Sequence, residues 1–167
     1  QLVVQYANSL SVPAPVSVAA AQPAIYTQNQ AGTGQGAIVN GVTNVLADSR
    51  NPVRAGDVIA IYCTGLGPVT PAVAEGVAAS TTVLSRTTTP VTATVGGRPA
   101  TVNFAGLAPG YIGLYQVNVV VPTGVTAGDA VPVRAGEKHY FVALEDGTRL
   151  TCVHDVASAL AIKERGL

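Results

Sequence analysis

The sequence predicts an all-β fold of the sandwich type, and three observations support this. The 167 residues include 18 Gly and 11 Pro but no Met or Trp, a usage typical of short strands joined by turns. From Tyr115 to Val121 apolar residues alternate with others, so a strand there has an apolar face and a face carrying Gln116 and Asn118. The pair Gly96-Gly97 separates two β-branched runs, which is the signal of a two-residue hairpin.

The N-terminal part of the sequence predicts short extended segments. Leu2–Tyr6 and Pro15–Ala21 are apolar runs, and the proline-containing stretch between them disfavours a regular helix. Gln22–Thr27 follows as a third extended segment.

A glycine-rich stretch occupies residues 30–37. Gly32, Gly34 and Ala37 can be fitted to a dinucleotide-binding fingerprint, but that fingerprint needs a helix directly after it to meet the pyrophosphate. The residues that follow are β-branched and include another glycine. We therefore interpret this stretch as a turn between strands.

The middle of the chain supplies the predicted core strands. Asp57–Thr64 is apolar on both faces, as expected for a strand inside a sheet. Thr87–Val95 and Arg98–Phe104 flank the glycine pair, and Ala130–Arg134 is the last strand-like run of this region.

The C-terminal part of the sequence predicts a hairpin and a short helix. Asp146-Gly147 lies between two strand-like runs within residues 137–153 and indicates a hairpin turn. Asp155 is a candidate N-cap for a helix from Val156 to Arg165. A helix of about ten residues is marginal alone, so we expect it to dock on the sandwich or on a partner.

Charged residues are few and unevenly placed. The formal net charge is zero, and residues 1–47 contain no Asp, Glu, Lys or Arg. Residues 137–167 hold nine of the eighteen charged residues (9 Lys and Arg plus 9 Asp and Glu). The uncharged segment is a candidate for burial against its own domain or a neighbour, although a secreted protein of low-charge composition would give the same pattern.

Several classes of function are disfavoured by the residues present. Nucleic-acid binding would need clustered Lys and Arg, which the chain lacks. Cys152 and His154 lie two residues apart on one predicted strand, without the geometry that activates a nucleophile. The two histidines and scattered carboxylates lack the spacing of a metal site. We therefore expect no enzymatic activity, no metal and no cofactor.

An ordered set of short motifs resembles a known family. Over roughly residues 14–134 the chain is similar to the uncharacterised C-terminal domain family of acidobacterial secreted proteins. The motifs that carry this resemblance are Pro23-Ala-Ile-Tyr26, Gly34-Gln-Gly-Ala37, Ala55-Gly-Asp-Val-Ile59, Thr64-Gly-Leu-Gly-Pro68, Val95-Gly-Gly-Arg-Pro-Ala100, Ala105-Gly-Leu-Ala-Pro-Gly110, Gly113-Leu-Tyr-Gln-Val-Asn-Val119 and Val121-Pro122.

The resemblance implies an extracellular or cell-surface module with an immunoglobulin-like β-sandwich fold, here extended by the C-terminal hairpin and short helix. It implies no catalytic residues. The expected organisation is an N-terminal strand segment at residues 1–22, a sandwich core at 23–136 and a tail at 137–167 that departs from the family pattern. No apolar run approaches the roughly 20 residues that span a bilayer, and an N-terminal Gln suggests the processed form of a longer precursor.

The two cysteines allow one intrachain bond. Cys63 lies with Ile59 and Ile61 on a predicted core face, and Cys152 lies in the tail. In an extracellular sandwich a disulfide between them would tie the tail to the core; the alternative is two buried free thiols.

The N-terminal segment is the candidate for assembly. It resembles the closing strand of a preceding module, which suggests exchange of a strand between copies or neighbouring modules. The residues that would fill pockets on a partner are Leu2, Val3, Val4, Val16 and Val18. The alternative is that these strands pair within their own domain.

Two functional classes remain. The first is a structural module, a protomer of an extracellular fibre or stalk joined by β-strand complementation. The second is an adhesion or carbohydrate-binding module, which usually needs exposed aromatic rings; the chain has six Tyr, two Phe and no Trp. We expect the first class, with a glycan as the alternative partner.

Overall fold

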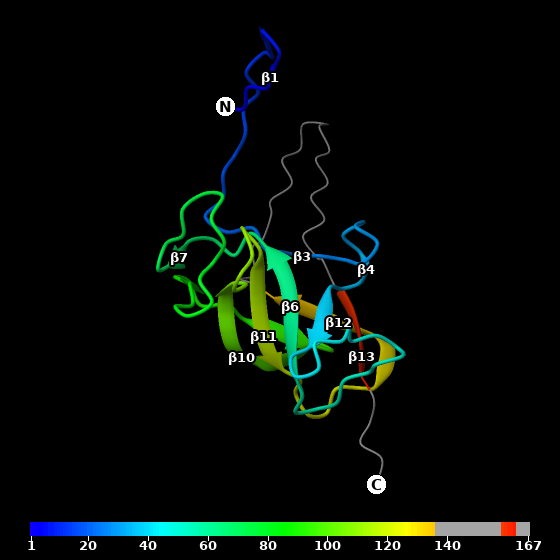
Figure 1. The fold of residues 1–167 in the computed structure, drawn as a ribbon. Coiled ribbons are helices and arrows are strands. Elements are labelled where there is room, and N and C mark those ends of the chain that lie inside the picture. The colour runs from blue at the N-terminus through cyan, green and yellow to red at the C-terminus, as the bar shows by residue number, and fades with distance from the viewer. Residues whose placement is uncertain (136–157, 163–167) are drawn as a thin grey trace.

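The computed structural model describes residues 1–135 and 158–162, and every regular element in this part of the chain is a β-strand (Figure 1). The strands are β1 (Gln5–Tyr6), β2 (Ser9–Leu10), β3 (Ala24–Ile25), β4 (Gly34–Gln35), β5 (Ile38–Asn40), β6 (Val58–Thr64), β7 (Val69–Thr70), β8 (Arg86–Thr87), β9 (Ala93–Val95), β10 (Arg98–Leu107), β11 (Tyr115–Val120), β12 (Gly128–Ala135) and β13 (Ser158–Ile162).

Eleven of these strands form one strongly curved sheet. Its hydrogen-bonded order is β3-β6-β11-β10-β9-β12-β13-β4, with β5 also on β6 and with β7 and β8 beside β10. A single bridge between Thr27 and Gly36 connects the segments next to β3 and β4, so the sheet nearly closes on itself. The fold is therefore an all-β, near-barrel sandwich. Its all-β, sandwich-type class is what the sequence predicts, whereas the near-closure of the sheet was not predicted.

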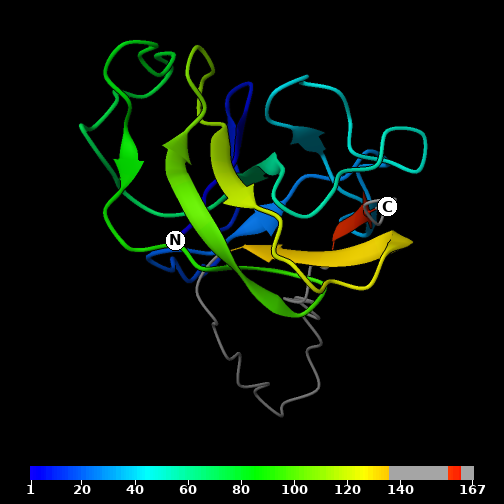
Figure 2. The same ribbon diagram turned by 90° about the horizontal axis from the view of Figure 1, so that it is seen from below.

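β10 joins the two layers of this sandwich. It pairs with β11 from Thr101 to Leu107 and with β9 from Arg98 to Ala100, and the β11 register shifts between Val102 and Phe104. Figure 2 shows β10 crossing from the layer of β11 to the layer of β12. A bulge of this kind bends a strand and allows one strand to serve two layers.

The predicted hairpin at Gly96-Gly97 is confirmed. Both glycines have positive φ, 57° and 75°, and Val95 pairs with Arg98 across the turn. This is the backbone that a type I′ turn requires and that glycine adopts at little cost. The glycine-rich stretch at residues 30–37 is also a turn between strands, because Ile38 begins β5 instead of a helix.

The core lies between the two layers. β6 has β11 on one side and β3 and β5 on the other, so it is an interior strand of the sheet. Its inward side chains Ile59, Ile61 and Cys63 are buried in the core, whereas Tyr62 on its outward face is partly exposed. The largest side chains with less than 2% exposure are Ile38, Val53, Ile59, Ile61, Cys63, Val95, Val117, Val119, Val121 and Val133. The alternation from Tyr115 to Val121 thus places its apolar face in the core, as predicted.

The predicted helix from Val156 to Arg165 is wrong. Ser158–Ile162 is strand β13, which pairs antiparallel with β12 and in parallel with β4. A helix of about ten residues is marginal alone even with good helix formers, whereas the edge of β12 offers backbone hydrogen-bond partners. The predicted hairpin within residues 137–153 lies outside the described residues.

Candidate assembly arm and outer sheet face

The N-terminal arm, residues 1–20, extends away from the sandwich (Figure 1). Its strands β1 and β2 pair only with each other, and Leu2 and Ala14 exchange backbone hydrogen bonds of 2.8 and 2.9 Å. Among the described residues, the arm therefore pairs with itself and does not join the sheet of its own domain. This differs from the predicted strands, because Pro15–Ala21 forms no strand and the pairing falls at Gln5–Tyr6 and Ser9–Leu10.

All of the predicted assembly residues lie on this arm and are exposed to solvent. The exposed fractions are 53% for Leu2, 44% for Val3, 58% for Val4, 51% for Val16 and 92% for Val18. Tyr6, Leu10 and Val12 are exposed by 85%, 69% and 86%. A soluble domain rarely presents so many apolar side chains together unless another surface covers them.

The hairpin of the arm has little stability of its own. Each of its strands has two residues, and Ala7 in the turn has a positive φ of 51°. A two-stranded hairpin is marginal in water, and an L-residue in the left-handed region adds strain. The arm can therefore exchange this hairpin for pairing elsewhere at small cost.

The root of the arm is fixed to the sandwich. The backbone N–H of Gln22 donates to the carbonyl of Gly65 at 2.7 Å. A Cβ on Gly65 would lie 2.0 Å from the Gln22 carbonyl oxygen, and one on Gly67 would lie 2.8 Å from that of Ala20. Only glycine permits this close approach, so the chain leaves the fold at a defined point.

Cys63 lies in the core, 1% exposed, and forms no disulfide within the described residues. Burial raises its pKa to about 12, since the apolar surroundings disfavour the thiolate. A neutral, buried thiol is a poor nucleophile. Its predicted partner Cys152 lies outside the described residues, so the disulfide stays a prediction.

The outer face of the sheet is formed by the outward-pointing residues of β3, β6, β11 and β10. Gln116 of β11 lies opposite Tyr62 of β6 on one side and Gly106 of β10 on the other. The register of β3 with β6 brings Tyr26 next to Tyr62, and the Tyr26 N–H donates to the Tyr62 carbonyl at 3.0 Å. The row Tyr26, Tyr62, Gln116 and Gly106 therefore crosses four strands.

The two amides on this face bond to each other. Gln116 Nε2 donates to Asn118 Oδ1 at 2.7 Å, and both side chains lie on the outward side of β11. Because buried amides need hydrogen-bond partners, the sequence predicts that Gln116 and Asn118 bond the backbone of the loop at residues 64–68, and this prediction is wrong. Tyr115 makes that contact instead, because its hydroxyl donates to the Gly67 carbonyl from the rim of the core.

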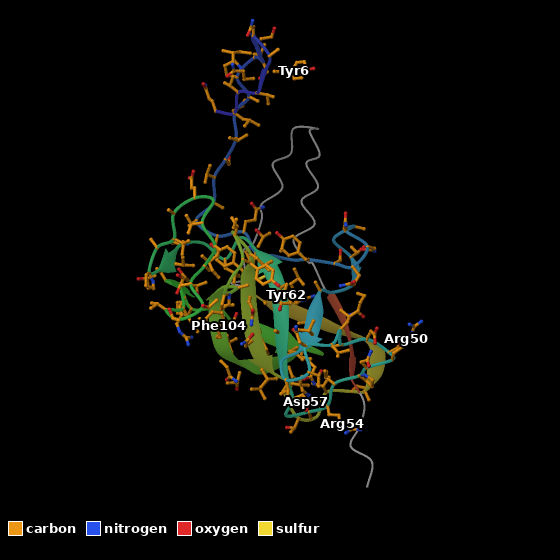
Figure 3. All side chains as sticks on the ribbon, viewed as in Figure 1. Tyr6, Arg50, Arg54, Asp57, Tyr62 and Phe104 are labelled. Carbon is orange, nitrogen blue, oxygen red and sulfur yellow. The ribbon has the colours of Figure 1, made fainter. Side chains whose placement is uncertain are left out.

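The buried Phe104 side chain lies at the β10 edge of this face. It is 7% exposed, and its ring lies close to the position a Cβ on Gly106 would occupy, 3.0 Å away. The Arg86 guanidinium lies 5.0 Å from the centre of the ring, which is cation–π geometry. Figure 3 shows Phe104 and Tyr62 on opposite sides of β11.

Arg54 and Asp57, which Figure 3 labels, close a turn. The Arg54 N–H donates to the Asp57 carboxylate at 2.8 Å, and the Asp57 N–H donates to the Arg54 carbonyl at 3.0 Å. These two hydrogen bonds close the loop that leads into β6, so the Asp57 carboxylate has a structural role.

Within residues 1–135 and 158–162, no three His, Cys, Asp or Glu side chains gather as metal ligands would, and none of the described segments is a helix long and apolar enough to cross a membrane. The tyrosine pair on the outer face was missed from sequence, because only the strand register brings Tyr26 beside Tyr62. Comparison of the chain with protein-family models, with curated proteins and with solved structures gives no match.

Proposed function

We propose that this protein is a non-enzymatic structural module that assembles through its N-terminal arm by β-strand complementation, as a protomer of an extracellular fibre or stalk. The observation that carries this proposal is the exposure of the apolar, uncharged arm on a root that is fixed to the sandwich. The resemblance to secreted immunoglobulin-like modules supports the extracellular or cell-surface location.

The arm has the chemistry of a donor strand. In strand complementation, backbone hydrogen bonds supply much of the affinity and alternate side chains fill pockets on the partner. Val16 and Val18 are spaced by two residues, so an extended backbone directs both to the same side. Full burial of a valine or leucine side chain stabilises by about 1.5–3 kcal/mol, so a few of them offset the loss of a weak hairpin.

The proposed acceptor is the edge of β12, which β13 occupies in the single chain. β13 pairs with β4 at only two positions, Ser158 with Gly34 and Ala159 with Gln35. A neighbour's arm would take the place of β13 along β12. The arm would then have the position of a closing strand, which its sequence resembles.

The test compares the full chain with a chain that lacks residues 1–20, by light scattering and negative-stain microscopy. The truncation keeps Gln22 and its bond to Gly65. We expect oligomers or filaments from the full chain and monomers from the truncated one. Unchanged assembly after truncation, or a monomeric full chain at high concentration, would refute the role of the arm.

A charge variant provides a matched control. Val18→Glu places a carboxylate on a side chain that is 92% exposed in the single chain, and Val42→Glu does so at an 87% exposed position on the turn after β5. Burial of an unpaired charge is costly, so Val18→Glu should prevent assembly while Val42→Glu should not. A photo-crosslinker at Val18 should label the β12 peptide of another copy.

A further inference from the structure

The outer face presents hydrogen-bonding groups that the described protein leaves unused. The bond between Gln116 Nε2 and Asn118 Oδ1 is the only side-chain hydrogen bond that either amide makes among the described residues. A primary amide offers a carbonyl acceptor and two N–H donors. The Gln116 carbonyl oxygen and the Asn118 amino group therefore remain for water or a ligand, held in place by their partner amide.

Aromatic surface lies beside these amides. Tyr26 is 46% exposed, and Tyr62, which is partly exposed, separates it from Gln116 in the cross-strand row. A tyrosine combines an apolar ring with a hydroxyl that can stay in contact with water. Two of the six tyrosines, Tyr26 and Tyr62, lie on this face, and the Phe104 ring lies at its β10 edge.

The lack of charged side chains on the outer face limits the chemical class of ligand that it can bind. The row from Tyr26 through Tyr62 and Gln116 to Gly106 carries no charged side chain, and the cation at its end, Arg86, already lies over the Phe104 ring. A nucleic acid would need several cations along its path. An anionic ligand would likewise find little opposite charge here, so the face suits a neutral ligand.

We propose that the outer face binds a neutral oligosaccharide. A pyranose ring has a C–H face that can stack on a tyrosine ring and hydroxyls at its rim that both donate and accept. Tyr26 and Tyr62 provide two neighbouring stacking positions, and Gln116 and Asn118 provide the donor and acceptor for the hydroxyls. The site is a surface across adjacent strands and is separate from the N-terminal arm.

The experiment is an ¹⁵N-correlation NMR titration of the full-length Val18→Glu chain, which should stay monomeric, with cellohexaose, xylohexaose, laminarihexaose and chitohexaose. We expect at least one of these sugars to shift the backbone signals of β6 and β11, with Kd of about 1 mM or tighter. Failure of all four sugars to bind at millimolar concentration would overturn the inference.

Substitutions locate the binding surface. Tyr62→Ala, Tyr26→Ala and Gln116→Ala should each weaken binding by about tenfold or more, which equals about 1.4 kcal/mol. Tyr111→Ala and Tyr6→Ala remove tyrosines that are 58% and 85% exposed at other places and should leave Kd unchanged. If the substitutions on the outer face and those elsewhere weakened sugar binding equally, the proposed site would be refuted.

Two further variants keep the result interpretable. Tyr62→Phe preserves the ring and should retain most of the binding if Tyr62→Ala fails to fold. The chain without residues 1–20 should bind sugar as the full chain does, because the arm contributes nothing to this face. Loss of assembly and loss of sugar binding are thus separate outcomes, and loss of sugar binding on removal of the arm would contradict the proposed platform.

Discussion

Cys63 and Tyr115 are direct partners across the ladder that joins β6 to β11. Cys63 is enclosed in the core, while Tyr115 reaches from the rim of the core to the Gly67 carbonyl. Burial, with a smaller contribution from Cys63, raises the pKa of the Tyr115 hydroxyl, so that it stays a hydrogen-bond donor. This pair links the centre of the fold to the loop on which the root of the arm rests.

The buried thiol makes the reduced protein sensitive to alkali. Its pKa rises from 9.0 to about 12 on folding, so between these values the unfolded chain releases a proton that the folded chain keeps. The free energy of unfolding should therefore fall with rising pH, by up to about 1.4 kcal/mol per pH unit from this group. Urea unfolding from pH 8 to 11 measures the slope, and Cys63→Ala should make it shallower. Equal slopes would exclude this contribution.

The hydroxyl of Tyr115 should contribute measurably to stability. Tyr115→Phe removes its hydrogen bond to Gly67 and leaves a carbonyl with one fewer donor, which should cost about 1 kcal/mol. Tyr111→Phe is the control, because that side chain is 58% exposed. Chemical denaturation of both variants provides the comparison; a loss of the same size in both would argue against the role of the bond.

Two glycines with similar backbone conformation should tolerate alanine differently. Gly65 and Gly76 have φ of 74° and 73°, but a Cβ on Gly65 would meet the Gln22 carbonyl at 2.0 Å and one on Gly76 would meet nothing within 4 Å. Gly76→Ala should cost about 1–2 kcal/mol through strain alone. Gly65→Ala should cost more than about 3 kcal/mol, because the root of the arm must move. Thermal unfolding of both variants checks the difference.

A core aliphatic side chain should matter much more for the stability of the monomer than an aliphatic side chain of the arm. Ile61→Ala leaves a cavity at a fully buried position and should cost about 2–5 kcal/mol. Val18→Ala should change the stability of the monomer by no more than about 0.5 kcal/mol. A large effect of Val18→Ala in dilute, monomeric protein would mean that the arm packs on its own domain.

The predicted disulfide between Cys63 and Cys152 has a direct test. Intact mass spectrometry of the native protein without reductant should show the loss of two hydrogens relative to the reduced chain. In the chain-entropy model this bond would stabilise by up to roughly 4 kcal/mol. A mass that corresponds to two free thiols would rule the bond out.

Much of the sandwich could be predicted from local sequence. The glycine pair at 96 and 97 determined the hairpin by backbone conformation, and the alternation from Tyr115 to Val121 determined which side chains enter the core. Both signals depend on residues close together in the chain. β13 could not be found in this way, because its conformation depends on hydrogen bonds to β12.

The two candidate sites differ in the same way: the arm could be predicted from local sequence, and the outer face could not. The arm was recognisable from its lack of charge and its apolar residues, which are properties of composition. The outer face was not, because Tyr26 and Gln116 are 90 residues apart in sequence numbering and become neighbours of Tyr62 only through strand register. The partner of Gln116 was also missed, since rotation of a side chain decides whether an amide reaches a loop or another amide.

The near-closure of the sheet through Thr27 and Gly36 affects how copies of the protein can join. A sheet that closes in this way has little exposed edge through which two copies could pair symmetrically. If the donor strand sits on a tether and the acceptor is another part of the surface, each contact is heterologous and leaves one donor and one acceptor free at the ends. Copies joined in this way have polarity and add head to tail, so the expected product is an open chain instead of a closed dimer.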